Sequence, residues 1–141
     1  MRIACFGLLL VCSSVLAGQK EDPMAFIKNM PYTQMVKDMT LARCIAQVAD
    51  PKSPYSLDAA RSANAMREWM PFDIENGDAK INALINQFKG TTHQFHTESP
   101  QNVKGLTLNC LRLYHSPELD KLAKEVLLKN PQHTWHQDNP N

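Results

Sequence analysis

The stretch NCLRLYHSPELDKLA, residues 109–123, carries the clearest helix signals and the residues on which a chemical function could depend. Apolar residues recur at helical spacing through its first half, so a helix is expected to carry Cys110 on an apolar face between two leucines. Ser116 and Pro117 mark the start of another helix, because serine caps free amides and proline tolerates the first helical position. His115 therefore lies in the break between two helices.

Helical spacing of apolar residues continues through the rest of the chain, and no stretch has the pattern of a strand hairpin. Asp73 is expected to cap a helix whose inward face carries Ile74, Ile81, Leu84, Ile85 and Phe88. The predicted fold is all-α, a compact bundle of about five helices with one disulfide. The five helices are expected over about residues 32–49, 56–70, 73–89, 100–114 and 117–129.

The N-terminus has the pattern of a cleaved secretory signal peptide. Arg2 precedes an apolar run that ends at Val15, and Ala17 provides a small residue at the expected cleavage position. The run is too short to span a membrane stably, so the exported protein is expected in the periplasm without a membrane anchor. The expected segments are the signal peptide (1–17), an N-terminal linker (18–31), a helical domain (32–129) and a polar C-terminal tail (130–141).

Cleavage would leave 124 residues with 14 basic and 14 acidic side chains. Such a neutral domain is a poor candidate for binding nucleic acid or an anionic membrane. Cys5 and Cys12 would leave with the signal peptide, whereas Cys44 and Cys110 would remain. Because exported proteins enter an oxidising compartment, these two cysteines are expected to form the one disulfide.

Cys110 and His115 could instead be a nucleophile and its base, or two metal ligands. A catalytic thiolate needs an exposed, electropositive pocket, whereas Cys110 lies on an apolar face. His115 would project away from that face, because five residues turn a helix well past one full turn. We expect a partly buried histidine at the end of the helix, and a protein that is not an enzyme.

Two histidine pairs also invite a metal hypothesis. His93 with His96, and His133 with His136, have a spacing that suits a metal only where the backbone is fixed. Both pairs fall in predicted loop or tail sequence, and no further ligands complete a site. We therefore expect no metal and no cofactor. A periplasmic metal-binding or stress-related helical protein that uses these pairs remains the alternative function.

Three segments together resemble a known family: LARCIAQVAD, DAARSANAM and, above all, LTLNCLRLYHSPELDKLAKE. They are similar to the type VI secretion amidase immunity proteins, specifically those paired with the fourth class of amidase effector. The resemblance covers about residues 32–128. It implies a small helical periplasmic protein that forms a homodimer. It also implies a partner, a secreted cysteine amidase that cuts the peptide stems of peptidoglycan, from which the producing cell is protected.

Two exposed features are candidates for contact with such an effector. One is the acidic start of the third predicted helix, and the other is the loop GTTHQFHTESPQN, which contains an aromatic residue with polar neighbours. The candidate contact residues are Asp73, Glu75, Asp78, His93, Gln94, Phe95, His96 and Glu98. The alternative is that the charges form a solvated face and that Phe95 folds back onto the core.

Overall fold

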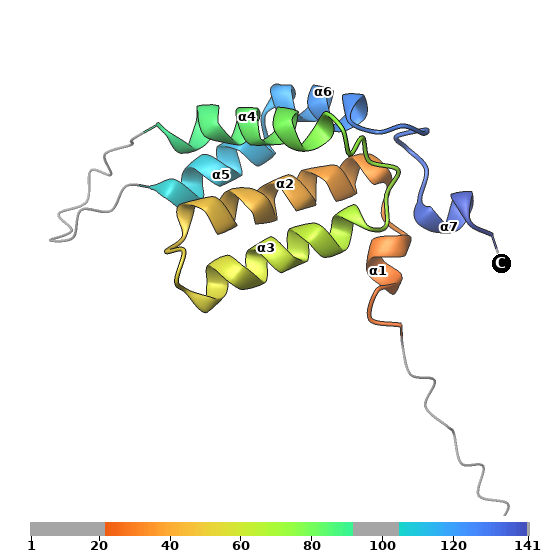
Figure 1. The fold of residues 1–141 in the computed structure, drawn as a ribbon. Helices are drawn as coiled ribbons and strands as arrows, with labels where there is room; N and C mark the ends of the chain where they lie inside the picture. The colour runs from red at the N-terminus through yellow and green to blue at the C-terminus, as the bar shows by residue number, and fades with distance from the viewer. Residues whose placement is uncertain (1–21, 92–104, 141) are drawn as a thin grey trace, which may run out of the picture.

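The computed structural model describes residues 22–91 and 105–140, and most of them are helical (Figure 1). The helices are α1 (Ala25–Lys28), α2 (Tyr32–Val48), α3 (Pro54–Arg67), α4 (Gly77–Lys89), α5 (Leu106–Tyr114), α6 (Pro117–Glu125) and α7 (Trp135–Asp138). The described residues contain no strand, only one isolated antiparallel bridge between Phe72 and Leu127. The predicted all-α bundle of five sizeable helices is confirmed, with α1 and α7 as single added turns.

Helix α2 is the centre of the bundle, with α3 on one side and α4 and α5 on the other (Figure 1). It contributes the most deeply buried side chains, because Met35, Val36 and Met39 have no exposed surface and Tyr32 has almost none. Close-packed apolar side chains of this kind supply most of the free energy that holds helices together. The remaining helices are therefore positioned by their contacts with α2.

Helix α3 makes the most extensive contact with α2. Its facing residues are small, and Ala63 is almost fully buried, which lets the two helices approach closely. The helix begins at Pro54, with the Ser53 hydroxyl accepting a hydrogen bond from the Ser56 backbone N–H. Ser56, at which this helix was expected to begin, instead donates from its hydroxyl to the Ala46 carbonyl of α2.

Helix α4 begins at Gly77, four residues later than the sequence predicts. The preceding residues are extended, because the Asp73 N–H donates to Val126 and the Leu128 N–H donates to Pro71. Phe72 then packs against Gly77 so closely that any Cβ at that position would overlap its ring. Ile74 is 77% exposed as a consequence, so its predicted place in the core is wrong.

Helices α5 and α6 lie where residues 109–123 predicted two helices separated by a break. The Ser116 hydroxyl accepts a hydrogen bond from the Leu119 N–H and Pro117 is the first residue of α6, as predicted. Helix α5 begins at Leu106, after Gly105 with a left-handed φ of 63° that favours glycine. The predicted helix start at Ser99 and Pro100 lies outside the described residues.

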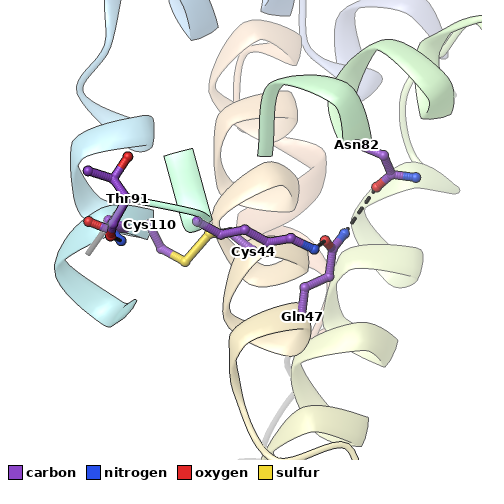
Figure 2. Close-up of a disulfide and its surroundings, with 7 residues drawn as sticks. Cys44, Gln47, Asn82, Thr91 and Cys110 are labelled. Atoms are coloured by element: carbon purple, nitrogen blue, oxygen red, sulfur yellow. Dashed lines mark hydrogen bonds between the residues drawn. A yellow bond between two sulfur atoms is a disulfide. The ribbon is translucent and has the colours of Figure 1, made fainter. Parts of the chain in front are cut away.

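A disulfide joins Cys44 and Cys110, whose Cα atoms are 5.7 Å apart. Both residues are fully buried, and the bond links α2 to α5 across 66 residues of sequence (Figure 2). The predicted pairing is confirmed. No helix in the described ranges is both long and apolar enough to cross a membrane.

Candidate functional site

The structure separates Cys110 from His115 chemically as well as in space. The Cys110 sulfur is held in the buried disulfide and offers no thiolate. His115 is the C-terminal cap of α5 and donates its backbone N–H to the Leu111 carbonyl at 3.1 Å. Its side chain is exposed, so the expected partial burial is wrong. In this oxidised state the two residues cannot act as a nucleophile and base.

The predicted acidic residues Asp73 and Glu75 lie in the turn that leads into α4. The Asp73 carboxylate accepts hydrogen bonds from the backbone N–H groups of Glu75 and Asn76, each at 3.1 Å. The bond from the Asn76 backbone is the main reason that the pKa of Asp73 lies below its ordinary value. Glu75 is exposed. The turn therefore presents one ordered carboxylate and one free to contact a partner.

Asp78, the third predicted acidic residue, lies between two arginines. Its two oxygens are each 2.7 Å from a guanidinium nitrogen, one of Arg43 from α2 and one of Arg67 from α3. Only about a third of the Asp78 side chain is exposed, and Arg43 is more buried still. The carboxylate therefore joins three helices, and its charge is offset by two positive ones. The structure does not group Asp78 with the other two acids as an exposed set.

The predicted contact residues His93, Gln94, Phe95, His96 and Glu98 lie outside the described residues. The structure does describe both residues that border this segment, Thr91 and Gly105. The side chain of Asn109 donates to the Thr91 carbonyl at 2.5 Å, and its backbone N–H donates to the Gly105 carbonyl at 3.1 Å. Asn109 thus contacts Thr91, which lies in the predicted loop, and forms with Gly105 the usual i to i−4 backbone bond of a helix.

Sequence reasoning missed Asn109, although a signal was present. The residue follows Leu106 by three positions and precedes Leu113 by four, so it falls on the apolar face of its helix. A polar residue at such a position is buried at a cost unless it forms hydrogen bonds. Its partner, Thr91, is 18 residues away and could not be read from the spacing.

A second cluster closes the opposite end of the bundle (Figure 1). The rings of Trp69 and Trp135 meet edge to face with centroids 5.2 Å apart, and the Lys28 ammonium lies 4.5 Å from the centre of the Trp69 ring. The Asp138 carboxylate accepts from the Tyr32 hydroxyl at 3.1 Å and lies 2.8 Å from a ring nitrogen of His133. We call this set the terminal cluster: Lys28, Tyr32, Trp69, His133, Trp135 and Asp138.

Hydrogen bonds within the terminal cluster shift the pKa values of Asp138 and Tyr32. The hydrogen bond with His133 is the main cause that lowers the pKa of Asp138. Burial, followed by the bond to Asp138, raises the pKa of Tyr32 to about 12. His136 shares no metal site with His133, and nowhere in residues 22–91 or 105–140 do three or more histidine, cysteine or acidic side chains form a group that could hold a metal ion.

A shallow hollow of about 270 Å³ lies between α2 and α6. Two of its charged groups pair with each other, since the Lys37 ammonium is 2.6 Å from the Asp120 carboxylate. Beside it, the Tyr114 hydroxyl donates to Asp38 at 2.9 Å and accepts from Gln34 at 2.6 Å. These groups satisfy one another and do not converge on a ligand, which suits a surface that binds rather than one that reacts.

Comparison with known proteins identifies relatives of this chain by sequence and by fold. Residues 34–123 match the family model described as "Tai4: Type VI secretion system (T6SS), amidase immunity protein". A solved structure from Serratia marcescens, described as "New Type VI-secreted toxins and self-resistance proteins", is 60% identical, with a TM-score of 0.78. That match covers 86% of this chain and 94% of the Serratia chain. No protein of curated description matches the chain.

A second solved structure, from Salmonella typhimurium, is described as "Structure of the effector - immunity system Tae4 / Tai4". It is 22% identical, covers 71% of this chain and 93% of that chain, and has a TM-score of 0.62. At this identity the likeness concerns the fold alone. The family match, by contrast, includes α2 to α5 and most of α6, together with both cysteines. The chain belongs to the family of type VI secretion system amidase immunity proteins.

Proposed function

We propose that the chain acts in the periplasm, where it binds a type VI-secreted peptidoglycan amidase and blocks it, so that the producing cell is protected. The observation that carries the proposal is the family match over residues 34–123, supported by 60% identity to the Serratia marcescens chain. The described residues fit a role in binding, because the sulfurs of Cys44 and Cys110 are bonded to each other and the Asp78 and Asp120 carboxylates are paired with cations.

Export is part of the proposal, because an amidase that cuts peptidoglycan must be met outside the cytoplasm. The predicted cleavage after Ala17 would release the chain to the periplasm, and the Cys44–Cys110 disulfide is typical of an oxidising compartment. The mature chain is also proposed to form a homodimer. Exposed apolar side chains support this, among them Tyr55 and Leu57 on α3, which symmetric pairing would cover. Light scattering on the mature chain should give about twice the monomer mass.

The proposed contacts are the predicted loop as anchor and the acidic turn as a steering element. Phe95 with its neighbours His93, Gln94, His96 and Glu98 would enter the amidase cleft, since a central aromatic supplies much of the energy of many interfaces. Asp73 and Glu75 would attract a basic effector over longer distances. Asp78 was proposed with them, but its pairing with two arginines leaves it the smallest share of that attraction.

The test measures association and dissociation rates between the mature chain and the amidase encoded beside its gene. Phe95→Ala should weaken binding by about 2 kcal/mol or more, mainly through faster dissociation. Phe26→Ala is the matched control, because Phe26 is 60% exposed on α1 at the other end of the molecule. Glu75→Gln should mainly slow association, and most at low salt. An unchanged dissociation rate for Phe95→Ala would remove the loop as the anchor, and no binding at all would overturn the function.

A further inference from the structure

Residues 131–139 lie across the N-terminal end of α2 (Figure 1). We call them the C-terminal strap, and residues 128–130 before them its linker. Both lie beyond residue 123, where the family match ends. No strap residue is fully buried and the linker is exposed, whereas Val126, just before the linker, has no exposed surface. The chain therefore leaves the core before the strap begins.

The strap provides the cap that the local sequence of α2 does not. Pro31, the N-cap residue, forms no side-chain hydrogen bond with the helix. The backbone N–H groups of Tyr32 and Thr33 donate instead to the carbonyls of His133 and Pro131, at 2.9 and 3.0 Å. The first amides of a helix have no partner within it, so opening the strap would leave these two amides to water.

Asp138 joins the strap to α2 through its side chain, only 12% of which is exposed. Its carboxylate accepts from the Tyr32 hydroxyl at 3.1 Å and lies 2.8 Å from a ring nitrogen of His133. The ammonium of Lys129, in the linker, lies 3.9 Å away. A hydrogen bond to an ionised acceptor is roughly twice as strong as one between neutral groups. The Asp138 bond is therefore expected to be the strongest of the three that tie the strap to α2.

The strap also has hydrogen bonds of its own. Thr134 and Gln137 form a capping box at the start of α7, and the His133 N–H donates to the Asn130 carbonyl at 3.1 Å. The hydrogen bonds from the strap to the rest of the described chain, by contrast, all end on the first two residues of α2. The strap can therefore separate from the helix without losing its internal turn.

Ring contacts complete the attachment. Trp135 meets Trp69 edge to face with centroids 5.2 Å apart, and the Lys28 ammonium lies 5.3 Å from the centre of the Trp135 ring. Terminal segments held by few, half-buried contacts open at a lower free energy than the core does. All these contacts lie at one end of α2, so losing them leaves the disulfide at the other end intact.

We propose that the C-terminal strap opens and closes as one unit while the rest of the bundle stays folded, and that Asp138 is the residue that holds it closed. Opening frees the first amides of α2, uncovers the buried Tyr32 ring and releases the linker. Exposed segments that open in this way are the preferred sites of proteolytic cleavage. The strap therefore determines where proteases first attack the folded protein.

The first test is limited digestion with trypsin, because Lys129 provides a cleavage site in the linker and is 58% exposed. Cleavage of a segment that opens transiently follows the population of its open form when closing is faster than cleavage. Asp138→Asn should be cut after Lys129 about tenfold faster than the unaltered protein. Asp78→Asn is the matched control, because it also removes a carboxylate with two partners but lies within the bundle. It should leave the rate of this cut unchanged.

The second test uses the two tryptophans of the chain, both of which belong to the terminal cluster. Tryptophan fluorescence therefore reports on the strap, whereas far-ultraviolet circular dichroism reports on all the helices. In a denaturant titration the fluorescence should change before the dichroism does. Asp138→Asn should lower the fluorescence midpoint more than the dichroism midpoint. Asp78→Asn should lower the dichroism midpoint more.

A further variant keeps the tests decisive if Asp138→Asn disturbs folding. Tyr32→Phe removes the same hydrogen bond from the other side and should also speed the cut after Lys129, by less than Asp138→Asn. Coincident fluorescence and dichroism transitions would show that the strap unfolds only with the whole bundle and would overturn the proposal. Equal acceleration of the cut by Asp78→Asn would overturn it too, because cleavage would then follow global unfolding. All measurements use the free mature protein, so their outcome does not depend on amidase binding.

Discussion

The end of the bundle where α4 stops and α5 begins is closed by the Cys44–Cys110 disulfide and the buried Asn109 bond, whereas the opposite end is closed by the terminal cluster (Figure 1). The contacts at the first end are a covalent bond and a hydrogen bond between uncharged groups. The second joins α1, α2 and the C-terminal segment through an aromatic pair, a cation over a ring and an ionised carboxylate. The two closures therefore respond differently to redox conditions and to pH.

This difference indicates how the small fold divides its tasks. A disulfide limits the unfolded chain whatever the pH, so the end that borders the proposed anchor segment keeps its geometry once oxidised. The terminal cluster depends on an ionised Asp138 and on two half-buried tryptophans. It joins α1 and α7 to α2, at the end of the bundle opposite the last residues of α4 and the first residues of α5 (Figure 1). Substitutions at the disulfide end should affect binding of the amidase. Substitutions in the terminal cluster should mainly affect the free energy of unfolding.

The largest expected effect is at the disulfide end. The double variant Cys44→Ala with Cys110→Ala should lower the free energy of unfolding by about 4 kcal/mol, because the bond closes a loop across 66 residues. Denaturant titration of the unaltered and double-variant proteins measures the difference. Reductant should destabilise the unaltered protein by a similar amount and leave the variant unchanged. A loss below about 1 kcal/mol would show that the covalent bond does not give the disulfide end a larger share of the stability than the terminal cluster has.

The next effect is at the terminal cluster. Trp135→Ala should lower the free energy of unfolding by about 2 kcal/mol, less than for a fully buried tryptophan, because the residue is half-buried and packs edge to face on Trp69. Trp135→Phe keeps an aromatic ring and should lose less. Neither variant should change the dissociation rate of an amidase complex. Faster dissociation in Trp135→Ala would break the division between a stabilising end and a binding end.

The fold could be predicted from the sequence wherever its cause is local. Helical spacing and the Ser116–Pro117 start signal predicted the start of α6 correctly, although the helix ends at Glu125, four residues before the predicted end. The apolar setting of Cys44 and Cys110 predicted their disulfide. The start of α4 could not be predicted in this way. Residues 71–73 pair with residues 126–128, and residues 74–76 form a turn. This contact between distant parts of the chain competes with the local helix pattern.

The candidate site was less predictable than the fold, because the properties of its residues depend on which side chains of other helices contact them. Asp78 was predicted as an exposed acidic residue. In the structure it pairs with Arg43 and Arg67, which are 35 and 11 residues away in the sequence. Trp135 and Trp69 form an edge-to-face pair, but nothing in the local sequence indicates that the two rings meet. Local spacing shows which face a residue occupies, whereas the packing of helices determines what it meets.

The smallest expected effect is the pH dependence of the terminal cluster. The hydrogen bond with His133 and that from Tyr32 lower the pKa of Asp138 below its ordinary value of 3.8. A carboxyl whose pKa is lower in the folded state stabilises that state above its unfolded pKa, and the contribution is lost as pH falls through the folded pKa. Asp138→Asn should therefore be less stable than the unaltered protein at neutral pH, and the gap should narrow below about pH 4.

Comparing the two proteins at each pH isolates this carboxyl, because Asp22 and Asp73, whose pKa values are also lowered, are present in both and cancel. Tyr32→Phe is the intermediate case, since it removes one of the two hydrogen bonds to Asp138 but adds no titrating group. Its stability difference should narrow over the same pH range, but by less. If the loss in Asp138→Asn is the same at pH 3 as at pH 7, the ionisation of Asp138 does not contribute to the stability of the terminal cluster, and the two ends of the bundle differ in covalent constraint but not in sensitivity to acid.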